Sequence, residues 1–321
     1  MTRYKIVCEY VGSAFSGWQK TAYECKKKPV QQVLEESLEV FIRSPVRVVG
    51  SSRTDSGVSA LNQVAHFDID KRISKTGEEI PLMDPDVMTM ALNQNFQEYP
   101  LRVISTTIVD NTFHSRFSAK SRTYLYRMTS GLHRNQLPFE LKDRVWAIQK
   151  TLDVDLMRQG ADILTGRHNF NSFRSAKCQA NNPERTISSF KVLDLPVPDV
   201  WRYNNPPKDV KILGLEIKAR AFLHNQVRIM VSVLERIGSH EMTLDQLRDL
   251  IKAQDRQKAP ATAPPFPLTL TKVSYVDDLA DQSPWLIPSL QSSQSQSQSQ
   301  SSTFGDLIKK GLAGLGWTKR D

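Results

Sequence analysis

Segments with strand-like and helix-like patterns of apolar residues alternate along this chain in one order that occurs twice. Apolar residues at every second position predict strands, and apolar residues three and four apart predict helices. The first run has strands expected over 4–10, 46–49, 63–69 and 101–104, and helices that begin at Pro29 and Pro85. This β-α-β-β-α-β order is the ferredoxin-like plan, so an α+β fold is expected for the first part of the chain.

The second run begins near residue 120. It has strands expected over 122–129, 186–193, 212–221 and 268–275, and helices over 152–164, 227–237 and 243–251. Little linker separates the two runs. We therefore expect an α+β chain with two ferredoxin-like, RRM-like halves, residues 1–115 and 116–280.

The composition changes after Asp278. Residues 291–302 are almost wholly Ser and Gln, which bury too little apolar surface to fold. We predict a disordered tail over 281–321. The alternative is a short partner-binding helix within 303–321, where apolar residues at helical spacing compete with several glycines.

The charge of the chain favours a polyanionic partner. Its 43 Lys and Arg residues exceed its 34 Asp and Glu residues, for a net charge of +9. Contacts to phosphates release counterions from nucleic acid, although many basic proteins bind none. No apolar run approaches the ~18–20 residues of a membrane span, and Met1 leads straight into a strand-like segment. We expect neither a membrane partner nor a secretory leader.

The cysteines and histidines do not form a metal-binding pattern. Cys8, Cys25 and Cys178 are scattered and odd in number, which is typical of reduced thiols in an intracellular protein. Four histidines share no metal-like spacing, so we expect no zinc site. They are His66, His114, His168 and His224.

The segment 51–60 is a polar loop between two strand-like runs and reads Ser-Ser-Arg-Thr-Asp-Ser-Gly-Val-Ser-Ala. Asp and Ser suit turns, and Gly57 allows a tight backbone turn, so Asp55 can be read as a turn residue. Arg53, however, places a cation two residues from that carboxylate. An active-site loop is the alternative reading.

Five motifs, in order and spacing, resemble those of the TruA-type tRNA pseudouridine synthases. The segment 51–60 is similar to the family's G-R-T-D-A-G-V-H-A, and 10–19 is similar to Y-D-G-x-x-Y/F-x-G-W-Q. Segments 113–119, 121–126 and 221–228 are similar to F-H-A-R-F-S-A, A-x-x-Y-x-Y and A-F-x-x-x-x-V-R. The residues of segments 51–55 and 121–126 resemble the animal branch of the family most closely.

The resemblance implies an isomerase that converts uridine to pseudouridine in tRNA without a cofactor. It also implies that the two halves share one mostly antiparallel sheet with a cleft between them. Asp55 matches the family's essential aspartate, and Arg228 matches the arginine that pairs with it. Tyr124 matches the tyrosine that stacks on the target uracil, and its phenol is an option for the carbon-5 proton.

The resemblance also assigns RNA contacts. Arg53 matches the residue that enters the RNA stack during base flipping, and Leu268 matches an apolar residue that packs over the base. His114 and Arg116 lie in the matching segment 113–119 and are expected to contact RNA. The chain departs from the family at three positions, which are Ser52, Ser59 and Pro267.

Other classes of function stay open on the residues alone. A non-catalytic RNA-binding module or RNA chaperone would have the same fold and charge, although neither half carries an RNP-type pattern. A ferredoxin-like assembly subunit would bind no RNA. The target uridine, mRNA as a further substrate, a homodimer, and cytoplasm against mitochondrion are left undecided by the sequence.

Overall fold

The structure is a computed structural model that describes residues 1–21, 26–70, 72–73, 79–80, 82–197 and 210–276. Residues 1–277 form one compact unit. Cys8 is buried, and it and Cys178 are free thiols. Cys25 and the tail predicted over 281–321 lie outside the described residues.

The fold is mixed α+β and is built on one large, mostly antiparallel sheet of ten strands in the order β6-β1-β3-β12-β7-β11-β10-β9, with β2 on β3 and β8 on β7. Two pairings are parallel, β12 with β3 and β7 with β8. The strands are β1 (Thr2–Tyr10), β2 (Val49–Gly50), β3 (Ser59–Ile69), β6 (Leu101–Val109), β7 (Ser121–Ser130), β8 (Trp146–Ala147), β9 (Gly166–Asn169), β10 (Glu184–Leu195), β11 (Lys211–Ala219) and β12 (Leu268–Ser274). A separate two-stranded ribbon joins β4 (Arg72–Ile73) and β5 (Glu79–Ile80).

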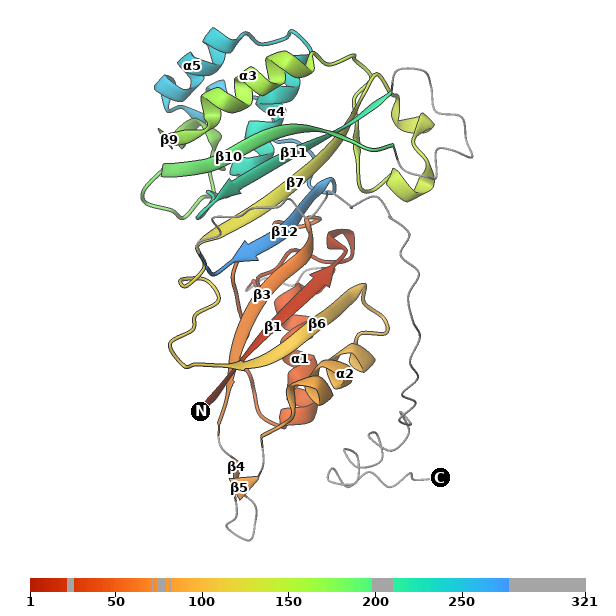
Figure 1. The fold of residues 1–321 in the computed structure, drawn as a ribbon, viewed down its shortest axis with the longest axis vertical. Coiled ribbons are helices and arrows are strands. Elements are labelled where there is room, and N and C mark those ends of the chain that lie inside the picture. Colours follow the sequence, from red (N-terminus) through yellow and green to blue (C-terminus); the bar gives the residue numbers. More distant parts are fainter. Residues whose placement is uncertain (22–25, 71, 74–78, 81, 198–209, 277–321) are drawn as a thin grey trace, which may run out of the picture. The chain divides into compact units, whose positions relative to one another are not determined.

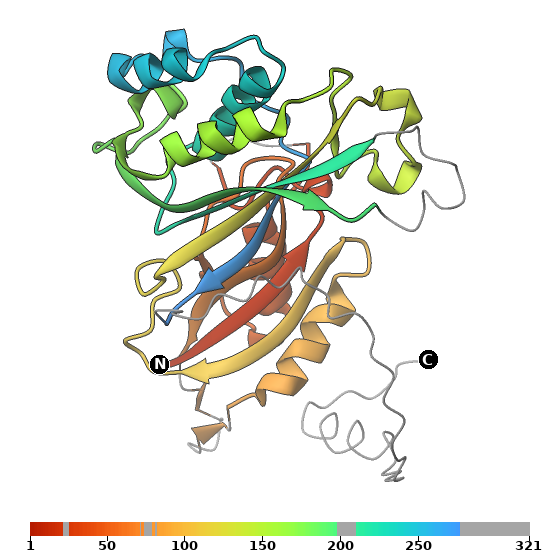
Figure 2. The same ribbon diagram turned by 45° about the horizontal axis from the view of Figure 1, so that its top comes forward.

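The described residues form five α-helices, which Figures 1 and 2 show in two groups. Helices α1 (Val30–Ile42) and α2 (Pro85–Asn95) lie beside β1, β3 and β6. Helices α3 (Val154–Leu164) and α4 (Gln226–Gly238) lie beside β7, β10 and β11, and α5 (Leu244–Ala253) packs against α3 and the edge strand β9. No helix in the part of the chain that the structure describes is long and apolar enough to cross a membrane.

Local sequence explains where the helices begin. The Asp84 carboxylate accepts hydrogen bonds from two backbone amides at the start of α2, and the Asp153 carboxylate accepts one at the start of α3. Thr243 and Gln246 form a capping box at the start of α5. Side-chain oxygens at these positions satisfy amides that have no partner within the helix.

Most predicted elements are confirmed, and the differences have physical reasons. The strand expected over 46–49 is only Val49–Gly50, because Val46 and Val48 are buried without ladder partners. The helix expected from residue 152 begins at Val154, since Asp153 is its cap. The strand expected from residue 63 begins at Ser59 and therefore follows the Asp55 loop directly.

Strand β12 joins the part of the sheet beside α1 and α2 to the part beside α3 and α4. It pairs in parallel with the start of β3, where Thr269 lies opposite Ser59. On its other side it pairs antiparallel with β7, where Leu270 lies opposite Tyr124. The loop before β3, the middle of β7 and the turn before β12 are therefore neighbours.

Candidate active site

The loop between β2 and β3 is fixed by hydrogen bonds from its inward-facing residues. The Ser51 hydroxyl donates to Gln63 Oε1 at 2.7 Å, and the Gln63 amide donates to the Ser52 carbonyl at 2.8 Å. The Thr54 hydroxyl lies 2.8 Å from the hydroxyl of buried Tyr10. These contacts hold the loop backbone against β1 and β3.

The same loop presents one cation and one carboxylate away from those contacts. Arg53 is exposed, and the Asp55 side chain is 21% exposed. The Val58 amide donates to the Asp55 carbonyl at 3.1 Å, and Gly57 adopts a φ of 83°, which favours glycine. The turn reading of Asp55 is therefore correct for its backbone, while its side chain is left to make other contacts.

Two glycines of segment 10–19 pack directly on this loop. A Cβ at Gly12 would lie 2.2 Å from the Val58 carbonyl carbon. A Cβ at Gly17, whose φ is 107°, would lie 2.9 Å from the Thr54 carbonyl oxygen. The Gly12 amide also donates to the Ser59 hydroxyl at 3.0 Å. Segments 10–19 and 51–60 therefore pack against each other, so the two motifs belong to one structural unit.

Arg228, in the first turn of α4, reaches the Asp55 carboxylate. Its Nη1 atom lies 3.3 Å from Asp55 Oδ2 and donates to Asn225 Oδ1 at 3.0 Å. Its Nε atom donates to the Ala263 carbonyl at 2.8 Å. Asn225 itself is left-handed, with a φ of 62°. Two oxygens besides the carboxylate therefore fix the direction of the guanidinium.

Tyr124 lies on β7 with its hydroxyl 2.6 Å from the Ser52 hydroxyl. Its ring is 6% exposed and meets Phe222 edge-on, with centroids 5.4 Å apart. Burial raises the pKa of Tyr124 to about 12, against a lowering by the Ser52 hydrogen bond. At neutral pH the phenol keeps its proton, so it is a poor proton acceptor in this state. Ser52, a departure from the family pattern, has the hydroxyl that contacts it.

Leu268 is buried at the start of β12, next to the Asp55 loop. Its amide donates to the Pro265 carbonyl at 3.0 Å. A Cβ at Gly57 would lie 3.0 Å from Pro265 Cγ, so this turn touches the loop. Pro267 fits the turn, because its carbonyl accepts from the Arg127 amide at 3.3 Å and all peptide bonds are trans among the described residues.

The two residues expected to contact RNA, His114 and Arg116, lie in one turn near Arg53. The His114 ring contacts His66 on one side, with centroids 4.7 Å apart, and Phe117 on the other, at 4.3 Å. Burial lowers the pKa of Arg53, and the nearby positive charge of Arg116 lowers it further.

Buried Arg122 ties three backbone segments of this region together. Its Nη2 atom donates to the Ser51 carbonyl and to the Arg116 carbonyl, each at 2.7 Å. Its Nη1 atom donates to the Arg220 carbonyl at 2.5 Å. One guanidinium therefore holds the Asp55 loop, the turn of Arg116 and the segment before α4.

One neighbour of Asp55 was not predicted from the sequence. His224 Nε2 lies 3.6 Å from Asp55 Oδ1, and the His224 side chain is 43% exposed. Its position four residues before Arg228 is the only signal in the sequence that could have indicated it. The histidine and the arginine approach different oxygens of the same carboxylate.

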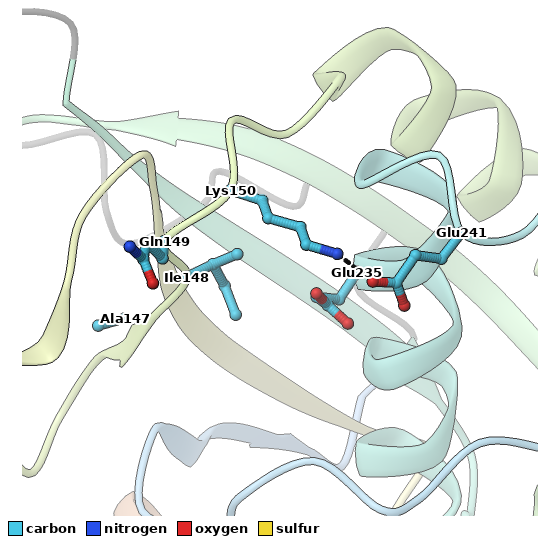
Figure 3. Close-up of a pocket in the computed structure, with 6 residues that line it drawn as sticks. All are labelled: Ala147, Ile148, Gln149, Lys150, Glu235 and Glu241. Carbon is cyan, nitrogen blue, oxygen red and sulfur yellow. Dashed lines mark hydrogen bonds and ion pairs between the residues drawn. The ribbon is translucent and has the colours of Figure 1, made fainter.

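A separate hollow lies beside the end of α4 and contains none of these residues (Figure 3). There Lys150 forms an ion pair with Glu241, and burial raises the pKa of Glu235. Among the described residues, no group of three or more His, Cys, Asp or Glu could hold a metal ion. The candidate site is therefore the set around Asp55, which is Arg53, Asp55, Tyr124, His224, Arg228 and Leu268.

Comparison with known proteins places the chain in a family. A family model described as tRNA pseudouridine synthase matches residues 6–118 and 161–276, which include Asp55 and Arg228, while Tyr124 lies between the two matches. The chain is 38% identical over 275 residues to tRNA pseudouridine synthase A of Afipia carboxidovorans, covering 86% of this chain and all of that protein. The protein of the same name from Parvibaculum lavamentivorans is 35% identical over 276 residues, and that of Wolbachia pipientis is 36% identical over 274; these matches cover 86% and 85% of this chain and all of each relative. The chain belongs to the tRNA pseudouridine synthase family of the TruA type.

Proposed function

We propose that this protein is an isomerase that converts uridine to pseudouridine in tRNA, with Asp55 as its catalytic carboxylate. The observation that carries the proposal is the contact of Arg228 with a partly exposed Asp55 on a loop fixed on both sides. The family membership supplies the reaction and the substrate. The contact supports Asp55 and Arg228 as the residues that act in it.

The reaction rearranges the atoms of one nucleotide and exchanges no electrons with a cofactor. The bond between the sugar and N1 of uracil breaks, the base turns, and a bond forms between the sugar and carbon 5. Carbon 5 loses a proton, and N1 gains one. Asp55 acts on the nucleotide, either by attack on the base or the sugar or by assisting the departure of uracil. Arg228 holds the carboxylate in position.

The target base has to leave the RNA stack before this chemistry. We propose that Arg53, exposed two residues before Asp55, enters the stack, and that Leu268 packs over the base. Tyr124 is nearly covered, so stacking of uracil on its ring includes a displacement of Phe222, which meets that ring edge-on. His114 and Arg116 contact the RNA beside the site.

We also propose the two-part division of the chain. The first half, residues 1–115, carries the Asp55 loop and contains the neighbouring strands β6, β1, β3 and β2 with helices α1 and α2. The second half, residues 116–280, contains the neighbouring strands β7, β11 and β10 with helices α3 and α4. This order supports two ferredoxin-like halves with a cleft at their junction. Because tRNA is an intracellular substrate, the proposal places the protein inside the cell, in cytoplasm or mitochondrion. Activity on mRNA and a homodimer are extensions of the same proposal.

The test is release of tritium from carbon 5 of labelled uridine in tRNA. Release occurs only when the new carbon–carbon bond forms. The proposal predicts release by the wild type. Binding of tRNA without any release would instead identify an RNA-binding module.

A further inference from the structure

We propose that Phe117 is a stacking platform for a nucleobase of bound tRNA other than the reacting uridine, with Arg116 placed for the adjoining phosphate. This inference rests on the proposed function, because it takes tRNA as the ligand. Neither the family match nor the names of the relatives assigns a role to Phe117.

The Phe117 ring has a second ring and a cation as neighbours, yet the residue is largely exposed. Its exposed fraction is 70%. The His114 ring lies at 35° to it with centroids 4.3 Å apart, and the Arg116 guanidinium lies 5.6 Å from its centroid. A flat apolar face beside a guanidinium is the combination that binds single-stranded bases.

The backbone that carries Phe117 is fixed before any ligand binds. The His114 Nδ1 atom accepts from the Arg116 amide at 3.1 Å and from the Phe117 amide at 3.2 Å. The Ser118 hydroxyl accepts from the His114 amide at 3.0 Å, and the Ser118 amide donates to the His114 carbonyl at 2.9 Å. A platform that is ordered in advance loses little entropy when a base stacks on it.

This turn is also fixed relative to the catalytic loop. The Arg116 and Ser51 carbonyls accept from the same nitrogen of Arg122, so the two backbones are neighbours. Arg53 lies close enough to Arg116 for the second charge to lower its pKa. A nucleotide on Phe117 is therefore part of the RNA strand that also enters the site of Asp55.

The charge around the platform fits a phosphate. Within the described residues, neither the Arg53 nor the Arg116 side chain has an acidic partner in an ion pair. Two unneutralised guanidiniums repel each other, and a phosphate between or beside them relieves that repulsion. An RNA strand has both groups that the platform fits, a base and a phosphate.

Phe139 provides a matched control within the same chain. It is 91% exposed, and the Lys142 ammonium lies 5.5 Å from its ring centroid. It belongs to a 3-10 turn, Phe139–Leu141, which comes after the C-terminal end of β7 in the chain. It is thus an exposed phenylalanine with a neighbouring cation but without the link to the catalytic loop.

The experiment measures the dissociation constant of total tRNA from cells lacking the protein at several salt concentrations. We expect Phe117→Ala to weaken binding about five- to a hundredfold at every salt concentration, and Phe117→Trp to bind at least as well as the wild type. Phe139→Ala is expected to bind like the wild type. Arg116→Gln is expected to reduce the slope of log K against log salt by about one, whereas Phe117→Ala leaves the slope unchanged.

Three results would overturn the platform while leaving the isomerase intact. They are wild-type affinity of Phe117→Ala, an equal loss in Phe139→Ala, and a reduced salt slope in Phe117→Ala, which would indicate a displaced arginine rather than a lost stack. The failure of the proposed function is separate, since it is the absence of tritium release by the wild-type protein. A wild type that binds no tRNA overturns both.

Discussion

Asp55 and Arg228, 173 residues apart in the chain, lie with Oδ2 and Nη1 3.3 Å from each other. The contact joins the loop before β3 to the first turn of α4. The two side chains are 21% and 14% exposed, so both charges are largely removed from water, and the cost of removing them offsets much of their attraction. Function is therefore a better reason for this pair than folding.

Replacing Asp55 by Asn should separate the two roles. The amide has the same size and is compatible with the turn, so the free energy of unfolding should change by less than about 3 kcal/mol. Tritium release from tRNA should fall by several orders of magnitude, as expected when an essential nucleophile is lost. Affinity for tRNA should be kept or rise slightly, because one negative charge has left a phosphate-binding surface. Release at the wild-type rate would show that Asp55 is only a turn residue.

Asn225 should control the direction of Arg228, and two substitutions distinguish this from a backbone role. Asn225 has a φ of 62°, which glycine adopts freely and alanine adopts at a cost of about 1–2 kcal/mol. Asn225→Gly should melt near the wild-type temperature but lose kcat, because only the Oδ1 acceptor of Arg228 is removed. Asn225→Ala should lose both kcat and stability. A wild-type kcat in Asn225→Gly would limit Asn225 to shaping the backbone.

Tyr124 should depend on its ring more than on its hydroxyl. Burial raises the pKa of the phenol to about 12, so it holds its proton at neutral pH. Tyr124→Phe removes one hydrogen bond to Ser52, which positions the ring, so kcat should fall by no more than about tenfold. Tyr124→Ala should lose about a further five- to hundredfold, since it removes the stacking surface as well. A loss in Tyr124→Phe as large as that in Tyr124→Ala would instead assign the carbon-5 proton to the hydroxyl.

The sequence predicted the parts of this fold that depend on local pattern. The alternation of Tyr4, Ile6, Cys8 and Tyr10 correctly predicted β1, and all four are buried. The same pattern wrongly predicted a strand from residue 46, because Val46 and Val48 are apolar and β-branched but have no neighbouring strand to pair with. The apolar residue types of a segment predict that it is buried, whereas its pairing depends on whether another strand lies beside it in the fold.

The contacts around Asp55 show the same limit at the site. Family motifs indicated Asp55, Arg228 and Tyr124, and the structure brings Arg228 into contact with Asp55. The approach of His224 to Asp55 and the Ser52–Tyr124 hydrogen bond were not predicted, because each joins segments that meet only through the order of the sheet. The sequence showed that Ser52 departs from the family pattern, but it did not show that the Ser52 hydroxyl contacts Tyr124.

His66 should make the stability of the folded protein depend on pH. His66 is buried on β3, and its Nδ1 atom accepts from the Ser115 amide at 3.2 Å. Burial, together with the nearby charges of His114 and Arg3, lowers the pKa of His66 to about 4, against a smaller opposing effect of Asp68. The unfolded chain has a histidine pKa of about 6.5. Between these two values the unfolded state binds a proton that the native state does not.

The free energy of unfolding should therefore fall as the pH falls from about 6.5 towards 4, and this contribution should level off below the native pKa. His66→Gln keeps an acceptor for the Ser115 amide and cannot titrate, so its stability should fall less steeply. The measurement is urea unfolding at several pH values between 7 and 5, above the range in which most carboxylates titrate. We expect the slopes of the wild type and the variant to differ by up to about one bound proton. His114 is retained in both proteins, so its own lowered pKa contributes to both slopes. Equal slopes would show that His66 takes up its proton in the folded protein as readily as in the unfolded chain.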